Sequence, residues 1–279
     1  MTQLVTYGIK KLGAPMSGIS SPLILGIDLE GMNRDLHFTG VDVKTDRVTE
    51  IGAVLWDWNA GQPVKIQSEL IDEVDHLPIS EEVEGITGIT DELLQNWGAK
   101  GQEIHVILEQ LKTLMNKADY IMAHNGPMYD IPMLRAMFSR YGLEMPEKTW
   151  IDSMTDIEFP KLMTGRSMAL LEHSHGFINP FPHRAVTDVL SMLKIARQYP
   201  ISRIMKLADS PRVTMVASLK APNWKDNVAV TEFNAIKNKV SKARFKWNPT
   251  KKIWTKEVHK VLIDEGKINF DFEWYIQEK

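Results

Sequence analysis

Short apolar runs alternate with amphipathic stretches along the first 200 residues of the chain. The run Leu23–Ile27 is too short to span a membrane and is typical of a buried strand. Four further runs predict strands, and the Gly-Gln-Pro at 61–63 favours an antiparallel connection between the first two of them. These runs cover residues 47–58, 64–71, 120–123 and 150–152. The pattern predicts a sheet that begins with three meandering strands.

Apolar residues elsewhere in this part recur at the three- and four-residue spacing of helices. The helical stretches lie at 88–98, 103–116, 130–141, 167–176 and 185–198. Thr90-Asp91 is a candidate cap for the first of them. Strands that alternate with helices in this way predict an α/β fold, in which a mixed sheet is flanked by helices.

The pattern changes after Pro200. Residues 213–219 predict a strand, residues 232–242 a helix, and residues 248–251 the turn of a hairpin, with another helix from His259. We therefore expect four parts. They are a flexible arm (1–21), the main domain (22–200), a linker (201–212) and a small α+β domain (213–279).

Composition narrows the classes of protein that fit. With 43% hydrophobic residues over 279 positions the chain can bury a full core, and its 8 Trp and 25% charged residues argue against disorder. The absence of Cys excludes disulfides, thiolate zinc sites and a cysteine nucleophile, and it fits a reducing compartment. No run reaches transmembrane length, and the first residues lack the apolar core of a secretory signal. We expect a cytoplasmic protein without a membrane partner, in the host cytoplasm if a phage encodes it.

The net charge of −3 conceals an uneven distribution. Residues 201–279 contain 16 Lys and Arg against 9 Asp and Glu, a net charge of +7, whereas residues 1–200 carry −10. Such a basic tail favours a polyanionic ligand.

Basic and aromatic residues interleave in this tail at Lys246, Trp247, Lys252 and Trp254. In nucleic-acid-binding proteins lysines neutralise phosphates while aromatic rings stack on unpaired bases, so we expect these four residues to contact nucleic acid. The alternative is that both tryptophans form the core of the small domain and the lysines its solvated rim.

Four acidic residues and a histidine stand where predicted elements meet loops. Asp28 and Glu30 end the first apolar run one residue apart, so their side chains project from the same face of a strand. Crowded carboxylates repel each other unless a cation lies between them, and oxygen-only pairs suit Mg²⁺ or Mn²⁺. Asp130 begins one predicted helix, and Asp188 lies on the flank of another, with His183 in the preceding loop. Taken singly, such residues are typical of a helix cap, solvated acids and a surface histidine.

The joint order of these residues resembles the DnaQ-like family of 3′–5′ exonucleases, in its DEDDh branch. Asp28-Leu29-Glu30 matches the first motif, the segment His124–Asp130 the second, and the segment His183–Asp188 the third. The spacing from His183 to Asp188 argues against the sister branch, in which tyrosine replaces the histidine. The resemblance covers about residues 22–200 and implies a ribonuclease H-like fold for them.

The resemblance also implies a mechanism. Asp28, Glu30 and Asp188 would bind a first Mg²⁺ or Mn²⁺ ion, Asp28 would bridge to a second, and Asp130 would act through water. Two such ions roughly 4 Å apart activate the attacking water and stabilise the leaving 3′ oxygen. His183 would take the proton from that water, a task that suits an imidazole on a movable loop.

Three further residues are implied to contact the substrate, namely Gly31, Met32 and Asn125. Gly31-Met32-Asn33 stands where the family often has Thr-Thr-Gly behind the terminal nucleotide. Glu84 stands where histidine is common, and Tyr129 replaces the usual phenylalanine. None of these departures falls on an implied metal ligand.

We therefore expect an exonuclease that hydrolyses DNA from its 3′ end, favours single-stranded or frayed ends, and releases nucleoside 5′-monophosphates. An exoribonuclease that trims RNA 3′ ends is the alternative of the same class, because the motifs do not read the 2′-hydroxyl. A non-catalytic protein that binds a polymerase or a nucleic-acid end is the alternative of another class, although a binding module has no need for all five residues. A structural metal-binding domain would not require the histidine. A polymerase partner and a homodimer both stay open.

Overall fold

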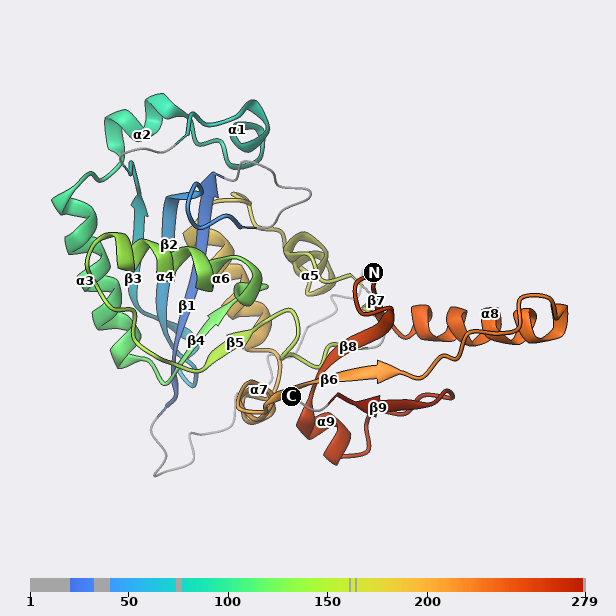
Figure 1. Cartoon of the computed structure of the whole chain (residues 1–279). Coiled ribbons are helices and arrows are strands. Elements are labelled where there is room, and N and C mark those ends of the chain that lie inside the picture. The colour runs from blue at the N-terminus through green and yellow to red at the C-terminus, as the bar shows by residue number, and fades with distance from the viewer. Residues whose placement is uncertain (1–20, 33–40, 74–76, 161, 164, 278–279) are drawn as a thin grey trace, which may run out of the picture. The chain divides into compact units, whose positions relative to one another are not determined.

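The computed structural model describes residues 21–32, 41–73, 77–160, 162–163 and 165–277 (Figure 1). The chain forms two compact units. The first contains the described residues up to Thr155 together with Phe159–Gln198, and the second contains Asp156–Glu158 together with the residues from Tyr199 onward. The arm expected at 1–21 lies outside the described residues except for Ser21.

The first unit is built on a five-stranded sheet with the strand order β3-β2-β1-β4-β5. Its strands are β1 (Leu23–Met32), β2 (Arg47–Asp57), β3 (Gln62–Leu70), β4 (Tyr120–Ala123) and β5 (Trp150–Asp152). β1, β2 and β3 pair antiparallel, whereas β4 pairs parallel with both β1 and β5. The mixed sheet that the sequence predicts, with three meandering strands at its start, is confirmed.

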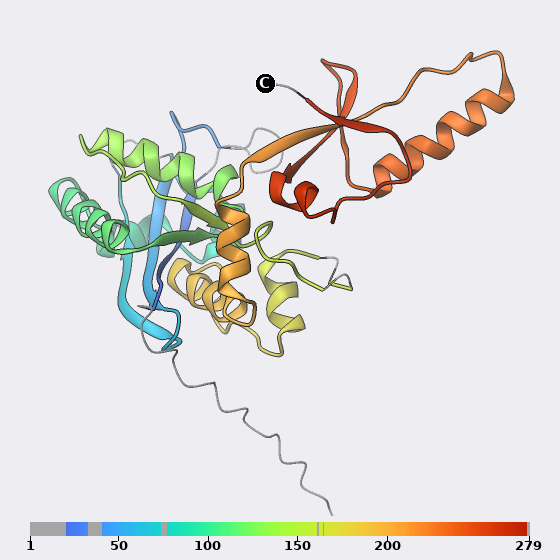
Figure 2. The ribbon, with the colours of Figure 1, turned by 90° about the horizontal axis from the view of Figure 1, so that it is seen from below.

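Helices cover both faces of this sheet (Figure 2). Their bounds are α1 (Glu81–Thr87), α2 (Asp91–Trp97), α3 (Gln102–Lys117), α4 (Asp130–Arg140), α5 (Met168–Ser174) and α6 (Ala185–Ala196), with a 3₁₀ turn η1 (Gly126–Met128). α3 and α4 share a core with residues of β1 such as Ile27. α6 lies on the opposite face, where a Cβ at Gly26 would be only 2.6 Å from Val189 Cγ1. Because side chains alternate along a strand, the α6 face also receives Asp28 and Glu30.

Helix α2 begins at the cap that the sequence predicts, whereas helix α1 is not predicted from the sequence. Thr90 Oγ1 accepts a hydrogen bond from the Leu93 N–H at 3.0 Å and so begins α2. Ser80 caps α1 in the same way, accepting from the Val83 N–H, and Gly88 ends that helix with φ at 67°. A side chain at Gly88 would strain this left-handed backbone, which explains the glycine there.

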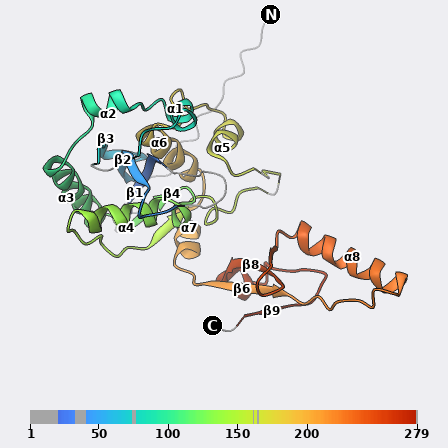
Figure 3. The same cartoon turned by 45° about the horizontal axis from the view of Figure 1, so that its top comes forward.

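The second unit combines an antiparallel sheet with helices, in agreement with the expected α+β class (Figure 3). Its elements are α7 (Ile201–Ala208), β6 (Arg212–Ala217), α8 (Asn227–Lys242), β7 (Lys246–Asn248), β8 (Ile253–His259), α9 (Lys260–Asp264) and β9 (Trp274–Ile276). The strand order is β7-β8-β6-β9. Met215, Val240 and Phe245 belong to its core. α8 buries Val240 near its end, and its earlier turns extend beyond the sheet.

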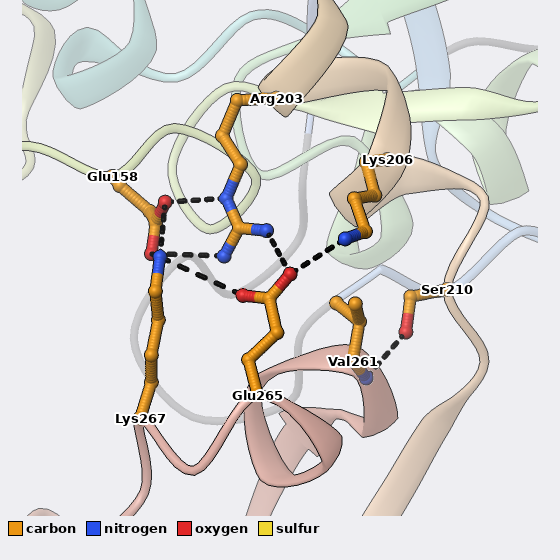
Figure 4. Close-up of polar contacts among 7 residues, drawn as sticks. All are labelled: Glu158, Arg203, Lys206, Ser210, Val261, Glu265 and Lys267. Atoms are coloured by element: carbon orange, nitrogen blue, oxygen red, sulfur yellow. Dashed lines mark hydrogen bonds and ion pairs between the residues drawn. The ribbon is translucent and has the colours of Figure 1, made fainter.

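The stretch expected as a linker instead forms helix α7, an amphipathic helix that begins after Pro200 and buries Ile204 and Leu207. A network of charges joins this helix to other parts of the second unit (Figure 4). Arg203 Nη1 lies 2.8 Å from Glu265 Oε1, and the same guanidinium also binds Glu158. Residues 201–208 are therefore an integral element of this unit. None of the helices in the described residues combines the length and the apolar character needed to cross a membrane.

Candidate active site

The first two acids lie at the carboxyl end of β1, in the middle of the sheet. Asp28 pairs in register with Gly52 of β2, and Glu30 pairs with Glu50. A bulge between Glu30 and Gly31 shifts the register, so that Gly31 pairs with Val48. Both acids project toward α6, as the spacing of two residues predicts.

Asp130 reaches the same region from α4. Strand β4 runs parallel to β1, so the segment that leaves it arrives beside the carboxyl end of β1. Asp130 is buried, and its Oδ1 accepts a hydrogen bond from the Leu29 N–H at 3.1 Å. Asn125 begins the turn η1 in the left-handed conformation (φ 62°), and its N–H donates to Asp152 Oδ1 at 2.9 Å. This polar anchoring positions the turn that leads to Asp130.

Asp188 and His183 come from the start of α6 and the loop before it. The backbone N–H of His183 donates to Asp188 Oδ2 at 3.1 Å, and Asn179 Nδ2 donates to Asp188 Oδ1 at 2.6 Å. His183 is exposed and has a positive φ of 59°, which is uncommon for a residue other than glycine. Candidate ligand atoms of Glu30, His183 and Asp188 all lie within 4.8 Å of one another.

The pKa values of all four acids in this cluster are raised above their ordinary values. Burial raises the pKa of Glu30 to about 8, and the nearby carboxylates of Asp188 and Glu50 contribute. Burial likewise raises the pKa of Asp130 to about 7. Burial and the charge of Asp130 raise the pKa of Asp28 well above its ordinary value, and burial also raises that of Asp188. Protein cations compensate this cluster incompletely, so ionising all four acids is unfavourable.

A divalent cation fits these residues. Carboxylate oxygens are the ligands that Mg²⁺ and Mn²⁺ prefer, and a bound cation would stabilise the charged form of each acid. Glu30, Asp188 and Asp28 offer oxygens on one face of the sheet, and Asp130 approaches from the start of α4.

The residues of the first unit that are implied to bind substrate differ in how accessible they are. Gly31 and Met32 are buried, and a Cβ at Gly31 would lie 2.7 Å from the Arg47 carbonyl oxygen of the neighbouring strand, so this position requires glycine. Asn125 is half-buried at the turn described above. His124 of the second motif is no candidate ligand, since its two ring nitrogens lie 2.8 Å from Ser153 Oγ and 2.7 Å from the Arg166 carbonyl oxygen.

The four candidate residues of the tail lie in the second unit. Trp247 and Trp254 pair across β7 and β8 with ring centroids 5.7 Å apart, and Trp247 is 48% exposed. Trp254 is half-buried and packs against the core of the unit, which supports the alternative for this residue. Lys246 is exposed but alternates to the other face of the sheet, and Lys252 lies in the hairpin turn.

Sequence reasoning assigned no role to three residues that contact the site. Glu50 binds Arg184 in the loop before α6, and Asn179 binds Asp188. Glu50 and Arg184 lie 134 positions apart, so no local pattern could have revealed their contact. Asn179 stands in a loop without any periodic signal.

Comparison with known proteins agrees with this geometry. The sequence model of the RNase_T family, described as "Exonuclease", matches residues 34–196. The nuclease domain of 3′hExo, described as a DEDDh family member bound to rAMP, superposes with a TM-score of 0.51 at 16% identity, over 64% of this chain and 91% of its own. A complex of E. coli exonuclease I with a dA16 oligonucleotide gives a TM-score of 0.52 at 15% identity, over 71% of this chain and 48% of its own. No curated protein matches the chain.

These matches confirm the resemblance that the motifs carry. The solved structures share the ribonuclease H-like arrangement of the first unit, and the family match covers more than half of the chain. The protein therefore belongs to the RNase_T exonuclease family, and its fold is that of the DEDDh exonucleases.

Proposed function

We propose that this protein is a divalent-metal-dependent 3′–5′ exonuclease that hydrolyses single-stranded or frayed DNA ends and releases nucleoside 5′-monophosphates. The observation that carries the proposal is the convergence of Glu30, His183 and Asp188 within 4.8 Å, beside Asp28 and Asp130, in a chain of the exonuclease family. A binding module would not require an exposed histidine beside four acids whose charges disfavour one another.

In this proposal Asp28, Glu30 and Asp188 hold Mg²⁺ or Mn²⁺, with Asp130 as a further acid that acts through water. The metal ions supply activation of the attacking water and stabilisation of the leaving 3′ oxygen. Asp130 is fixed by its hydrogen bond from Leu29, which ties the helix α4 to the strand that carries the first two acids. The chain thereby contributes a rigid set of oxygens rather than a flexible cluster.

His183 accepts the proton of the attacking water. Its side chain is exposed on the loop before α6, and its backbone N–H binds the Asp188 carboxylate. The base therefore stays attached to a metal-ligating residue while its ring remains accessible to a substrate. Loss of a general base typically slows such a reaction about 10²- to 10⁴-fold.

The second unit supplies affinity for the strand. Trp247 presents an exposed ring beside the hairpin turn that holds Lys252. Stacking of a base on such a ring contributes about 1–3 kcal/mol. A Trp247→Ala variant should bind a single-stranded oligonucleotide more weakly by this amount in a fluorescence-anisotropy titration. Trp97→Ala, at a 75% exposed tryptophan of the first unit, is the matched control and should bind as wild type does.

The direct test is digestion of 5′-labelled DNA and RNA oligonucleotides of the same sequence, with Mg²⁺ or with EDTA. The expected result is a Mg²⁺-dependent ladder that shortens from the 3′ end, faster on DNA. Asp28→Ala and His183→Ala should lose activity, whereas Glu92→Ala and His173→Ala, at exposed positions outside the site, should retain it. Digestion by the Asp28 and His183 variants at the wild-type rate would refute the proposal.

An exoribonuclease is the second candidate. One solved structure of similar fold is described by 3′-end-specific recognition of a histone mRNA stem-loop, with a TM-score of 0.51 at 17% identity. If the RNA oligonucleotide is shortened faster than the DNA one in the same assay, the substrate assignment passes to RNA while the catalytic assignment stands. Binding without digestion of either strand would favour a non-catalytic accessory protein.

A further inference from the structure

A fifth acid, Glu50, is buried directly beside the candidate metal ligands. It faces Glu30 across the β1–β2 pair, and its side chain is only 2% exposed. Like charges placed opposite each other on neighbouring strands are unfavourable, and a buried carboxylate without a partner is costly. A buried glutamate at this position therefore needs a specific compensating contact.

The compensation comes from the loop and helix that carry the candidate base. Arg184 binds Glu50 through two nitrogens, with Nη2 2.9 Å from Oε1 and Nε 3.1 Å from Oε2. The N–H of Ala185, the first residue of α6, donates to Oε2 at 3.1 Å. Both oxygens of Glu50 are thus engaged by donors of the protein, and this acid is not itself a metal ligand.

The same contact completes the start of α6. Arg184 is the N-cap residue of this helix, but its side chain makes no capping hydrogen bond. The carboxylate of Glu50 instead accepts from the first helical N–H, where a negative charge also interacts favourably with the helix dipole. Gly52, two residues along the same face of β2, leaves room for this approach, since a Cβ there would lie 2.3 Å from the Ala185 carbonyl carbon.

The position of the helix start determines the geometry of the candidate base. His183 immediately precedes Arg184, has a left-handed backbone and binds Asp188 through its N–H. Such a conformation persists only where the surroundings hold it. Two contacts hold the backbone of His183 in this conformation. The Asp188 carboxylate accepts from the N–H of His183, and the Glu50 carboxylate binds the side chain of Arg184, the next residue.

We propose that Glu50 and Arg184 are positioning residues of the active site. Their ion pair fixes the start of α6, so that His183 and Asp188 meet Glu30 at metal-binding distance. This inference rests on the proposed function and assigns a role within the same site.

The test compares two ion pairs of the same unit, each of which contains a buried glutamate. Arg140 and Glu73 form an equally bidentate pair, with Nε 3.0 Å from Oε1 and Nη2 2.8 Å from Oε2, and Glu73 is likewise buried. Arg140 ends α4, about three helical turns after Asp130. Glu50→Gln and Glu73→Gln therefore perturb similar contacts, but only the first touches the start of α6. In Glu50→Gln the amide NH₂ would face a protein donor instead of accepting from it.

Two properties are measured for each full-length variant, namely kcat and KM on the oligonucleotide, and the affinity for Mn²⁺ from its effect on Tm. Glu50→Gln should lower kcat or the Mn²⁺ affinity about 10- to 100-fold, as loss of a residue that orients metal ligands does, with KM for the oligonucleotide unchanged. Arg184→Lys should show the same defect in smaller measure, because an ammonium cannot form the two-nitrogen fork. Glu73→Gln should keep both properties at wild-type values.

Wild-type kcat and Mn²⁺ affinity in Glu50→Gln would overturn the inference, as would equal losses in Glu50→Gln and Glu73→Gln. If the wild-type protein digests no nucleic acid, the proposed function fails separately. The Mn²⁺ measurement then still decides the positioning role, since a selective loss in Glu50→Gln supports it and equal affinities refute it.

Discussion

Replacing Gly52 with alanine should damage the active site without touching any catalytic side chain. The added Cβ would lie 2.3 Å from the Ala185 carbonyl carbon and 2.4 Å from the Val186 nitrogen. Ordinary contacts of this kind begin at 3.4 Å, so the deficit is about 1 Å. Both obstructing atoms belong to the backbone of α6, so no side-chain rotation relieves the clash. The helix start itself has to move.

The size of the effect follows from this displacement. Insertion of one carbon into a tightly packed site costs about 1–3 kcal/mol. For a domain of this size that corresponds to a fall in Tm of about 2–12 °C. A displacement of about 1 Å in a catalytic group typically costs about 10²-fold in rate, and α6 carries Asp188 and is joined to His183 through Arg184 alone.

Gly85 provides the control, because a Cβ there meets nothing within 4 Å. It lies inside helix α1, where alanine is favoured over glycine by about 0.5–1 kcal/mol. Gly85→Ala should therefore keep the wild-type rate and raise Tm slightly, while Gly52→Ala lowers both. Circular dichroism melting and the oligonucleotide assay measure the two quantities. Wild-type Tm and rate in Gly52→Ala would contradict the close approach of α6 to β2 and the reasoning built on it.

Two further predictions concern charge. In EDTA the free energy of unfolding should fall as the pH rises from about 4.5 to 8. Glu30 has a pKa of about 8 and Asp130 of about 7 in the folded protein. The folded state therefore holds protons in this range that the unfolded state releases. Mg²⁺ should then raise Tm more at pH 8 than at pH 5, and a Glu30→Gln variant should show a weaker pH dependence in EDTA; an equal dependence would contradict the assignment. Arg203→Ala should lower Tm in 0.1 M NaCl by removing the contacts with Glu158 and Glu265, and the difference should shrink in 1 M NaCl, where charges are screened within about 3 Å. A difference that does not depend on salt would indicate that packing of the Arg203 stem is what matters.

Hydrophobic periodicity predicts the elements that are long or strongly patterned. The apolar run before Asp28 is β1, and the stripe of Val189 and Leu193 is α6. Helix α7 was expected as part of a linker, because Pro200 and Pro211 favour an irregular connection in sequence terms. The helix forms because Ile204 and Leu207 on its apolar stripe are buried in the folded protein, which is a tertiary effect. Strand β9 is not predicted, because its three residues are too few to show an alternation of apolar and polar side chains.

The candidate site likewise contains residues that the sequence predicts and contacts that depend on tertiary packing. The acids of β1 and the histidine before α6 could be identified because motif order is a property of the sequence. Their supporting contacts could not, since Glu50 binds Arg184 and Gly52 admits α6 only once β2 and α6 are packed together. A strand glycine and a buried glutamate carry no local signal of these roles.

The backbone of His183 bears on how a stalled complex with substrate could be obtained. At φ 59° the left-handed conformation is reached cheaply by glycine and by asparagine, and poorly by alanine. His183→Asn would therefore remove the proposed proton acceptor and leave the loop in its native path, whereas His183→Ala adds a reason for the loop to rearrange. For crystallography of a trapped 3′ end, asparagine is the better choice at this position.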